Sequence, residues 1–392
     1  MREITIQKVD TKKQEKEFII LPWKIYVNDE CWTPQLISDY KKAIRGESNS
    51  LVQSGPFEHI IAYKDREACG RLCVGINNDL NHAKGYKEGY ISLFECIDDY
   101  DVAKELFDYA SNWLKEKGMD RIIGPVSLPN GDDNRGLIID NFTDPTLVMN
   151  TYNKSYYRDL FEKYGFYKYW DCYAYRYNMS DEIDQRYRKF VPYAMEKYKF
   201  RIDKIDLKNI KKEMADIKQI IDEAMPDEWD DFMPPTDEEI EIMAKSLVPV
   251  ADPDLIYIAR TEEGRPIGFN IALPDYNQVL KKMNGKLFPI GFIKYLYYKK
   301  KIDRLRLFVL FVIPEYRRKG VPSAIYMKLF DEVKSKGYKY GEGSTVWEYN
   351  KIMQRDIEKL GGKIYKTYRI FKKDLNDNVQ IQDSVQTEYR VN

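Results

Sequence analysis

An internal repeat constrains the fold of this 392-residue chain more than any other feature. Near the end of each half, an asparagine is followed by a charged segment and a glycine: Asn153 precedes Gly165 by 12 residues, and Asn350 precedes Gly361 by 11. Upstream, each half has a helix-like run that ends at a Lys-Gly pair, which is typical of a helix C-terminus. The repeat predicts two similar units in tandem rather than one large core.

The order of apolar patterns within each half predicts an α/β fold. Each half has strand-like runs, a strand–loop–helix unit, another strand, a short helix and a final strand. We expect two tandem domains, each with a mixed central sheet flanked by helices. The first domain is expected over residues 1–180, a charged connector helix over 181–200, the second domain over 201–375 and a polar tail over 376–392.

The two halves differ at one loop. Tyr100 precedes Gly118 by 18 residues, whereas Tyr316 precedes Gly337 by 21. The three additional residues fall where the second half reads Arg-Arg-Lys-Gly-Val-Pro-Ser, directly after Tyr316. We therefore expect only the second half to carry this loop. Chance similarity among Lys- and Tyr-rich stretches is the alternative explanation for the repeat itself.

The loop joins a predicted strand, Leu305–Ile313, to a predicted amphipathic helix, Ser323–Lys336. A glycine turn at a helix N-terminus aims several backbone N–H groups at one point, and the helix dipole adds to them. Such a site suits a pyrophosphate, and the side chains of Arg317, Arg318 and Lys319 add positive charge. A solvated basic turn is the alternative interpretation of three consecutive charges.

At this loop the chain resembles the GNAT superfamily of N-acetyltransferases, in its tandem-domain bacterial type. The family's acyl-CoA loop is Arg/Gln-x-x-Gly-x-Gly/Ala, and Arg317 and Gly320 occupy its first and fourth positions. The chain departs from the pattern at Pro322, which has no N–H to donate to a pyrophosphate. Asn350 and Gly361 resemble the asparagine and the glycine of the family's next strand and helix.

The resemblance implies an acyl-CoA co-substrate, most simply acetyl-CoA, and an amine of a small molecule or peptide as the acceptor. It implies no metal ion. Asn350 would contact the pantetheine arm, and the backbone after the strand would pair with the pantetheine amides as an added strand does. The residues expected to bind the co-substrate are Phe311, Val312, Ile313, Arg317, Arg318, Lys319, Gly320, Val321, Pro322, Ser323 and Asn350.

The family's usual general acid is absent. Many members have a tyrosine seven residues after the asparagine, where it protonates the departing CoA thiolate, and this chain has Ile357 there. Tyr349, Tyr365 and Tyr368 are the nearby substitutes, with packing in the strand as the alternative role for each. The acid therefore has no strong candidate.

An amine acceptor also requires a base, because only the unprotonated lone pair attacks a thioester. Glu348 is the candidate base, since it precedes Asn350 by two residues and would share its side of a continuing strand. Glu342 is the second candidate base, although we expect it at the surface.

Composition restricts the functional class. The 63 basic and 63 acidic residues balance, which counts against a nucleic-acid partner. Five scattered Cys without a CxxC pair and only two His argue for reduced thiols and against a metal site. No apolar run approaches the roughly 18 residues of a membrane span. These features predict a cytoplasmic protein without stable membrane insertion, and they leave the oligomeric state open.

One basic and aromatic segment, Leu287–Lys301, is not part of the expected co-substrate or catalytic site. It suits contact with a membrane or an apolar substrate, with a helix packed over the core as the alternative.

Two other functions compete with N-acyl transfer. A Fem-type aminoacyl transferase also has two such domains but uses aminoacyl-tRNA, and an intact Arg317–Gly320 loop argues against it. A non-catalytic acyl-CoA sensor or scaffold is the second competitor, which the absence of a tyrosine at Ile357 permits.

Overall fold

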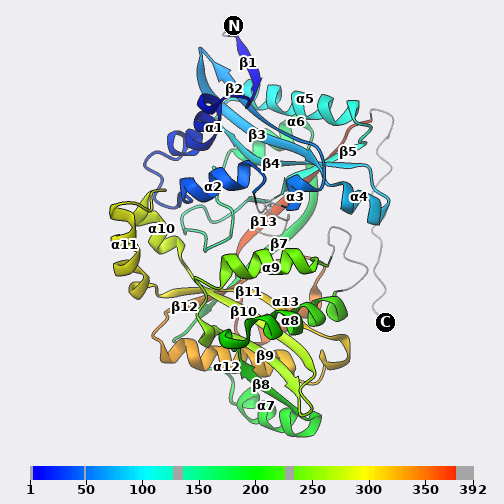
Figure 1. Ribbon diagram of the computed structural model, residues 1–392, viewed down its shortest axis with the longest axis vertical. Helices are drawn as coiled ribbons and strands as arrows, with labels where there is room; N and C mark the ends of the chain where they lie inside the picture. Colours follow the sequence, from blue (N-terminus) through cyan, green and yellow to red (C-terminus); the bar gives the residue numbers. More distant parts are fainter. Residues whose placement is uncertain (1–2, 48–49, 127–135, 226–233, 377–392) are drawn as a thin grey trace.

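A single mixed sheet runs through the whole molecule in the computed structural model, which describes residues 3–47, 50–126, 136–225 and 234–376 (Figure 1). Its strand order is β1-β2-β3-β4-β5-β13-β7-β12-β11-β10-β9-β8, and β6 pairs with β13 off this path. The strands are β1 (Ile4–Lys8), β2 (Phe57–Lys64), β3 (Glu67–Ile76), β4 (Glu88–Cys96), β5 (Arg121–Val126), β6 (Leu137–Ile138), β7 (Tyr167–Asn178), β8 (Phe200–Lys204), β9 (Ile256–Thr261), β10 (Pro266–Pro274), β11 (Arg304–Val312), β12 (Tyr340–Trp347) and β13 (Lys363–Asp374).

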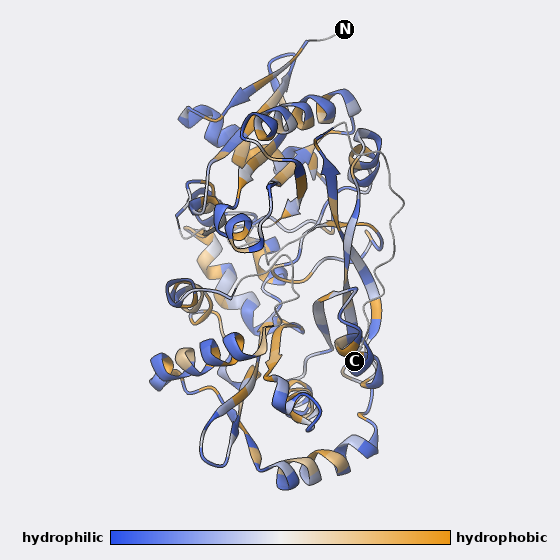
Figure 2. Ribbon diagram, turned by 90° about the vertical axis from the view of Figure 1, so that its right-hand side faces the viewer, coloured by the Kyte–Doolittle hydropathy of each residue, from blue (hydrophilic) through white to orange (hydrophobic). Residues whose placement is uncertain are grey.

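Helices flank this sheet along its length (Figure 1). They are α1 (Lys12–Ile25), α2 (Ile37–Ile44), α3 (Ser50–Gln53), α4 (Asn78–Lys84), α5 (Tyr100–Glu116), α6 (Tyr157–Tyr164), α7 (Gln185–Tyr198), α8 (Ile210–Ala224), α9 (Asp237–Leu247), α10 (Asn277–Met283), α11 (Ile290–Tyr298), α12 (Val321–Ser335) and α13 (Lys351–Lys359). The mixed colouring along most of them in Figure 2 is that of amphipathic helices, which turn one apolar face to a sheet.

Each half of the sheet has its own apolar core. In the first half, α5 packs against β1, β2 and β3, while Phe18 and Ile19 of α1 and Ile44 of α2 form a separate cluster around Ile61. In the second half, α8 packs against β10 and β11, and α12 packs against β8, β9 and β10. The expected α/β fold with two tandem domains, each a sheet flanked by helices, is confirmed.

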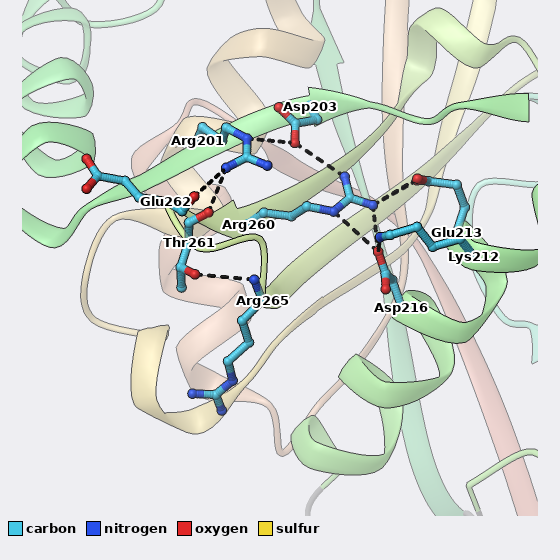
Figure 3. A network of polar contacts seen from close by, with 9 residues as sticks. All are labelled: Arg201, Asp203, Lys212, Glu213, Asp216, Arg260, Thr261, Glu262 and Arg265. Atoms are coloured by element: carbon cyan, nitrogen blue, oxygen red, sulfur yellow. Dashed lines mark hydrogen bonds and ion pairs between the residues drawn. The ribbon is translucent and has the colours of Figure 1, made fainter. Parts of the chain in front are cut away.

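A buried ion-pair network holds α8 against the sheet (Figure 3). Arg260 of β9 is 6% exposed and donates from Nη2 to Glu213 Oε1 at 2.9 Å and to Asp216 Oδ2 at 2.8 Å, both on α8. Its Nη1 lies 3.4 Å from Asp203 Oδ2 on β8. One guanidinium therefore links three elements of the second half, where its fork of donors can serve several carboxylates.

The two halves exchange their last strands. β7 comes from the first half but pairs with β12 of the second, from Tyr340↔Asn178 to Trp347↔Cys172. β13 comes from the second half but pairs with β5 and β7. Phe371 of β13 is consequently buried in the core of the first half. The domain bounds 1–180 and 201–375 stay a prediction. If the chain were divided at these bounds, the first half would lose β13 and the second half would lose β7.

The expected connector, residues 181–200, contains α7, which starts at the N-cap Asp184. Its helix packs against α12. The expected polar tail, residues 376–392, lies outside the described residues except for its first residue.

Candidate active site

The central feature of the second half is a separation of two adjacent parallel strands. β11 and β12 pair from Arg304↔Tyr340 to Leu307↔Gly343, and their ladder ends there. Beyond that point β11 continues along β10 to Val312, whereas β12 continues along β7. The residues of β11 from 307 to 311 are only half-buried, although the strand lies in the middle of the sheet. The separation leaves a backbone edge to which an extended ligand can hydrogen-bond.

The predicted loop lies at the end of this separated strand. Gly320 has φ +84° and is the N-cap of α12. A Cβ at this position would lie 2.9 Å from Ala194 Cβ and 3.1 Å from Phe190 Cε1 of α7. Glycine is therefore required by both the backbone conformation and the close approach of α7. The first N–H groups of a helix have no partner within it, so those of Val321 and Ser323 are available to an anion.

The three basic side chains of the loop do not converge. Arg317 donates from Nε to the Val312 carbonyl at 3.1 Å and from Nη2 to the Ala224 carbonyl at 2.5 Å, so it ties the loop to α8. Lys319 Nζ lies 3.3 Å from Glu315 Oε1 and above the Tyr316 ring. Arg318 is exposed. Binding of a co-substrate by these side chains stays a prediction, and Arg317 already has a structural role.

The corresponding helix of the first half begins differently. α5 follows β4 after three residues, and the side chain of its N-cap, Asp99, accepts from the Asp101 N–H at 3.0 Å. Lys64 pairs with the same carboxylate. A protein carboxylate thus occupies the place where an anion would bind, and the neighbouring Asp98 and Asp101 would repel one. This arrangement supports the expectation that only the second half carries an anion-binding loop.

A buried polar cluster lies where β11 and β12 begin to separate. Arg306 is 2% exposed and donates from Nε to Ser344 Oγ at 2.9 Å. Glu342 is 1% exposed and accepts from Asn150 Nδ2 at 2.6 Å and from the hydroxyls of Ser344 and Tyr365. The expectation that Glu342 lies at the surface is wrong, because β7 covers its strand on one side and the cluster encloses its carboxylate.

Two further ionisable groups lie near this cluster. Asp275 follows β10, is 2% exposed and accepts from the Val148 N–H at 2.9 Å. Burial, opposed in part by this hydrogen bond, raises the pKa of Asp275 to about 7. Lys366 is fully buried and donates to the Asn141 carbonyl at 2.7 Å, and burial lowers its pKa. A cluster of buried ionisable groups with perturbed pKa values marks a candidate functional site.

Sequence reasoning missed Asn150, Asp275 and Lys366. They come from three distant segments, and no local motif marks them. Only the tertiary fold brings these segments to the edge of the β11–β12 separation.

The predicted base and the asparagine do not share a strand. β12 ends at Trp347, and Glu348 Oε2 forms an ion pair with Lys168 Nζ at 2.6 Å. Asn350 caps α13 by accepting from the Met353 N–H at 3.2 Å. The continuing strand that would have aligned Glu348 with Asn350 is therefore absent. Their roles as base and pantetheine ligand stay predictions.

The three candidate tyrosines have different surroundings. Tyr349 packs against Trp347 and Trp170, with ring centroids 5.4 and 5.1 Å apart. Tyr368 is 1% exposed, and its hydroxyl has no hydrogen-bond partner among the described residues. Tyr365 alone donates to a carboxylate of the buried cluster.

Ile357 occupies the position of the family's tyrosine. Its side chain is 2% exposed and packs in a cluster with Tyr175 and Val346. An apolar side chain in apolar surroundings offers no proton at this place.

A cavity of about 210 Å³ is lined mainly by residues of the first half, together with Asn277 of the second. Asn150 lines it and also donates to Glu342. Among the described residues, three buried polar atoms at its wall have no hydrogen-bond partner: Asn150 Oδ1, Ser92 Oγ and Arg71 Nε. Buried polar atoms are normally paired, so these atoms suit a ligand or ordered water. Apolar and aromatic lining comes from residues such as Trp23, Trp32, Phe94, Val126, Met149 and Tyr152.

A buried carboxylate also borders this cavity. Glu95 accepts from the hydroxyls of Tyr26 at 2.8 Å and Tyr157 at 2.7 Å, and Arg71 Nη2 lies 3.8 Å away. Burial raises the pKa of Glu95 above its usual range. The cavity wall therefore combines apolar and aromatic side chains with many hydrogen-bonding groups at fixed positions, which a small-molecule ligand can use.

Within the described ranges, no three His, Cys, Asp or Glu side chains are grouped so that they could hold a metal ion. In the same part of the chain, no helix has the length and apolar character needed to cross a membrane.

Comparisons with known proteins agree with this geometry. The model of the acetyltransferase (GNAT) family matches residues 214–361. The "Bacterial ceramide synthase" of Caulobacter vibrioides is 26% identical over 384 residues, which are 95% of this chain and 98% of that protein. "Protein YghO" of Escherichia coli is 28% identical over 376 residues, which are 93% of this chain and 94% of that protein.

The fold has solved relatives of the same size. A tandem GNAT protein from the clavulanic acid biosynthesis pathway aligns over 95% of this chain and 99% of its own length, with a TM-score of 0.56 and 8% identity. Residues 214–361 thus match the GNAT acetyltransferase family, and the chain as a whole has the fold of a tandem GNAT protein.

Proposed function

We propose that this protein is an acyl-CoA-dependent N-acyltransferase. The observation that carries the proposal is the separation of β11 from β12 directly before the Gly320 turn at the N-terminus of α12. In this proposal the pantetheine arm pairs with the free edge of β11, and the pyrophosphate accepts from the first N–H groups of α12. The amine approaches through the cavity that ends at Asn150.

The reaction balances without a further reactant. The lone pair of the amine attacks the thioester carbonyl, a C–N bond forms, and the C–S bond breaks as the tetrahedral intermediate collapses. The amine nitrogen loses one proton, and the CoA sulfur leaves as a thiolate and takes up one. A thiol has a pKa near ~8.5, so its departure needs little assistance at neutral pH. Positioning of the two reactants supplies most of the remaining acceleration.

We propose Glu342 as the final acceptor of the amine proton. Its carboxylate accepts hydrogen bonds from the hydroxyls of Ser344 and Tyr365, so a proton can pass through either hydroxyl. Asn150 Oδ1 is free to accept from the N–H of the incoming amine. Glu348 remains the alternative base, although its ion pair with Lys168 holds it away from this cluster.

A long-chain amine is the more specific candidate acceptor. Ceramide is an amide of a fatty acid with a long-chain amino alcohol, so the name of the Caulobacter relative describes the same reaction class. The aromatic side chains at the cavity wall, Trp23, Trp32 and Phe94, would contact the hydrocarbon part of such an amine. Acetyl transfer to a small amine is the simpler alternative.

One experiment separates these candidates. The full chain is incubated with acetyl-CoA or palmitoyl-CoA and with a small amine, a peptide or sphinganine, and free CoA thiol and amide product are both measured. If the protein is an N-acyltransferase, one amide should form for each CoA thiol released. If its acceptor is a long-chain amine, the rate should be highest with sphinganine. Binding of acyl-CoA without thiol release by any acceptor would indicate a sensor and overturn the enzymatic proposal. Amide formation from aminoacyl-tRNA alone would assign the chain to the Fem-type class.

A further inference from the structure

Exposed apolar side chains cover one face of α11 and continue to Phe288, just before the helix. We call this surface the α11 patch, and its members are Phe288, Ile290, Phe292, Ile293, Leu296 and Tyr297, with exposed fractions from 44% to 72%. The other exposed large apolar residues of the described chain are dispersed over several elements. A concentration of this kind marks an interaction surface, whereas isolated exposed apolar residues are ordinary.

The patch lies in a purely basic segment. Residues 276–302 contain seven lysines and no Asp or Glu. The lysines are Lys281, Lys282, Lys286, Lys294, Lys299, Lys300 and Lys301, and all are exposed. In the part of the chain that the structure describes, none of them forms an ion pair with a carboxylate. Their positive charge is therefore not neutralised within the fold.

The rest of the fold holds this surface outward. Gly291 is buried on the opposite side of α11, where a Cβ would lie 1.9 Å from the Lys286 carbonyl. The ring of Tyr295 stacks on Tyr276, and Trp23 Nε1 donates to Asn284 Oδ1 at 3.0 Å. α11 is thus held by Gly291 and Tyr295, α10 is held by Asn284, and the apolar residues of the α11 patch face solvent.

We propose that the α11 patch docks the protein onto the surface of an anionic lipid bilayer. An apolar helix face that is flanked by lysines inserts its side chains at the boundary of headgroups and acyl chains, while the lysines contact anionic headgroups. A helix of 9 residues is far too short to cross the bilayer. The contact is therefore peripheral, which agrees with the expected absence of stable membrane insertion.

The charge distribution favours this occupant over a second copy of the chain. A symmetric dimer through the patch would bring both lysine sets together without any compensating carboxylate in residues 276–302. Like charges at an interface oppose association. A bilayer with anionic headgroups supplies the complementary charge.

The proposed docking also places the cavity near the lipid. Asn277 at the start of α10 lines the cavity, and so does Trp23, which contacts Asn284 between α10 and α11. A bilayer in contact with α11 would therefore lie close to this wall. The docking itself does not depend on any acyl transfer and can be tested without it.

The experiment measures binding of the full chain to vesicles by co-sedimentation. The probes are vesicles of phosphatidylcholine alone and vesicles that also contain phosphatidylglycerol. Binding to the second kind, weakened by salt, is expected. Ile290→Ser/Ile293→Ser should weaken it at least about tenfold. Lys299→Gln/Lys300→Gln/Lys301→Gln should weaken it by roughly fivefold for each lysine.

Two control variants test whether the loss of any exposed isoleucine, or of any three exposed lysines, weakens vesicle binding. Ile352→Ser removes an isoleucine that is 62% exposed on α13, compared with 63% for Ile290. Lys12→Gln/Lys13→Gln/Lys16→Gln removes three exposed lysines from α1. Both controls should bind as the unchanged protein does. Equal losses in a control and its matched variant would overturn the proposal, as would no binding of the unchanged protein to anionic vesicles. A dimer that Ile290→Ser/Ile293→Ser dissociates would instead assign the patch to a second copy.

Discussion

Gly320 is where the backbone, α7 and the proposed pyrophosphate site meet. We predict that Gly320→Ala lowers CoA affinity at least about tenfold, because φ +84° is strained for a side chain and the Cβ would displace α7 from the turn. Isothermal titration measures the affinity. Gly337→Ala is the control, since its φ is +78° and its Cβ would meet nothing within 4 Å. Unchanged CoA affinity in Gly320→Ala would mean that the loop is an ordinary surface turn.

Glu342 is the residue whose chemistry the proposed mechanism depends on. We predict that Glu342→Gln lowers turnover about 10²–10⁴-fold while CoA affinity survives, because the amide still accepts from Asn150 but cannot take a proton. Steady-state rates and CoA titration on the same variant test both statements. Glu348→Gln, which loses the ion pair to Lys168, should change turnover much less. The reverse order of the two effects would return the base assignment to Glu348.

Asp275 should make stability depend on pH. Its pKa of about 7 in the fold exceeds the usual carboxyl value, so the folded state binds the proton more tightly than the unfolded chain does. Its contribution to stability is complete below the unfolded pKa and is lost as the pH rises toward 7. Asp275→Asn should therefore be more stabilising, or less destabilising, at pH 8 than at pH 4, by up to about 4 kcal/mol. A difference in unfolding free energy that is the same at both pH values would contradict this.

At the scale of elements, the ion pairs of Arg260 determine how α8 is held. We predict that Arg260→Met lowers stability by about 3–5 kcal/mol, because Glu213 and Asp216 keep their charges in a buried place without a partner. Chemical unfolding measures the loss. Arg260→Met/Glu213→Leu should recover part of it, since one unpaired charge is then removed. Arg265→Met, whose side chain is 46% exposed, should cost far less.

The sequence pattern predicted the helices and strands whose ends are determined by residues that are adjacent in the chain. The expected strand Leu305–Ile313 and helix Ser323–Lys336 agree with β11 and α12 within two residues at each end. The end of β12 was missed, because Asn350 acts as a helix cap and the chain leaves the strand before Glu348. A cap and a strand residue look alike in a sequence that has no marked periodicity at this point.

Long-range arrangement could not be predicted in the same way. β7 and β13 have similar alternating patterns, and an alternating pattern does not specify the strand beside it. The buried cluster has the same origin, because Asn150 reaches Glu342 across 192 positions of the chain. The Gly320 loop could be predicted because all its parts are adjacent in sequence, whereas the cavity is formed by both halves together.

At the scale of the whole molecule, the exchange of strands joins the two halves into one cooperative unit. In a fragment of residues 201–376, β12 loses β7 and β13 loses β5 and β7, so two strands lose their antiparallel partners. Exposed strand edges of this length favour aggregation. We therefore predict that this fragment alone does not fold or bind CoA, and that residues 1–200 alone also fail to fold.

Co-expression of the two fragments should restore a soluble complex with one CoA site, because the missing strands are then supplied in trans. Circular dichroism, sedimentation and CoA titration follow the three samples. A fragment of residues 201–376 that folds and binds CoA without the other would contradict the exchange and restore the simple division into two independent domains.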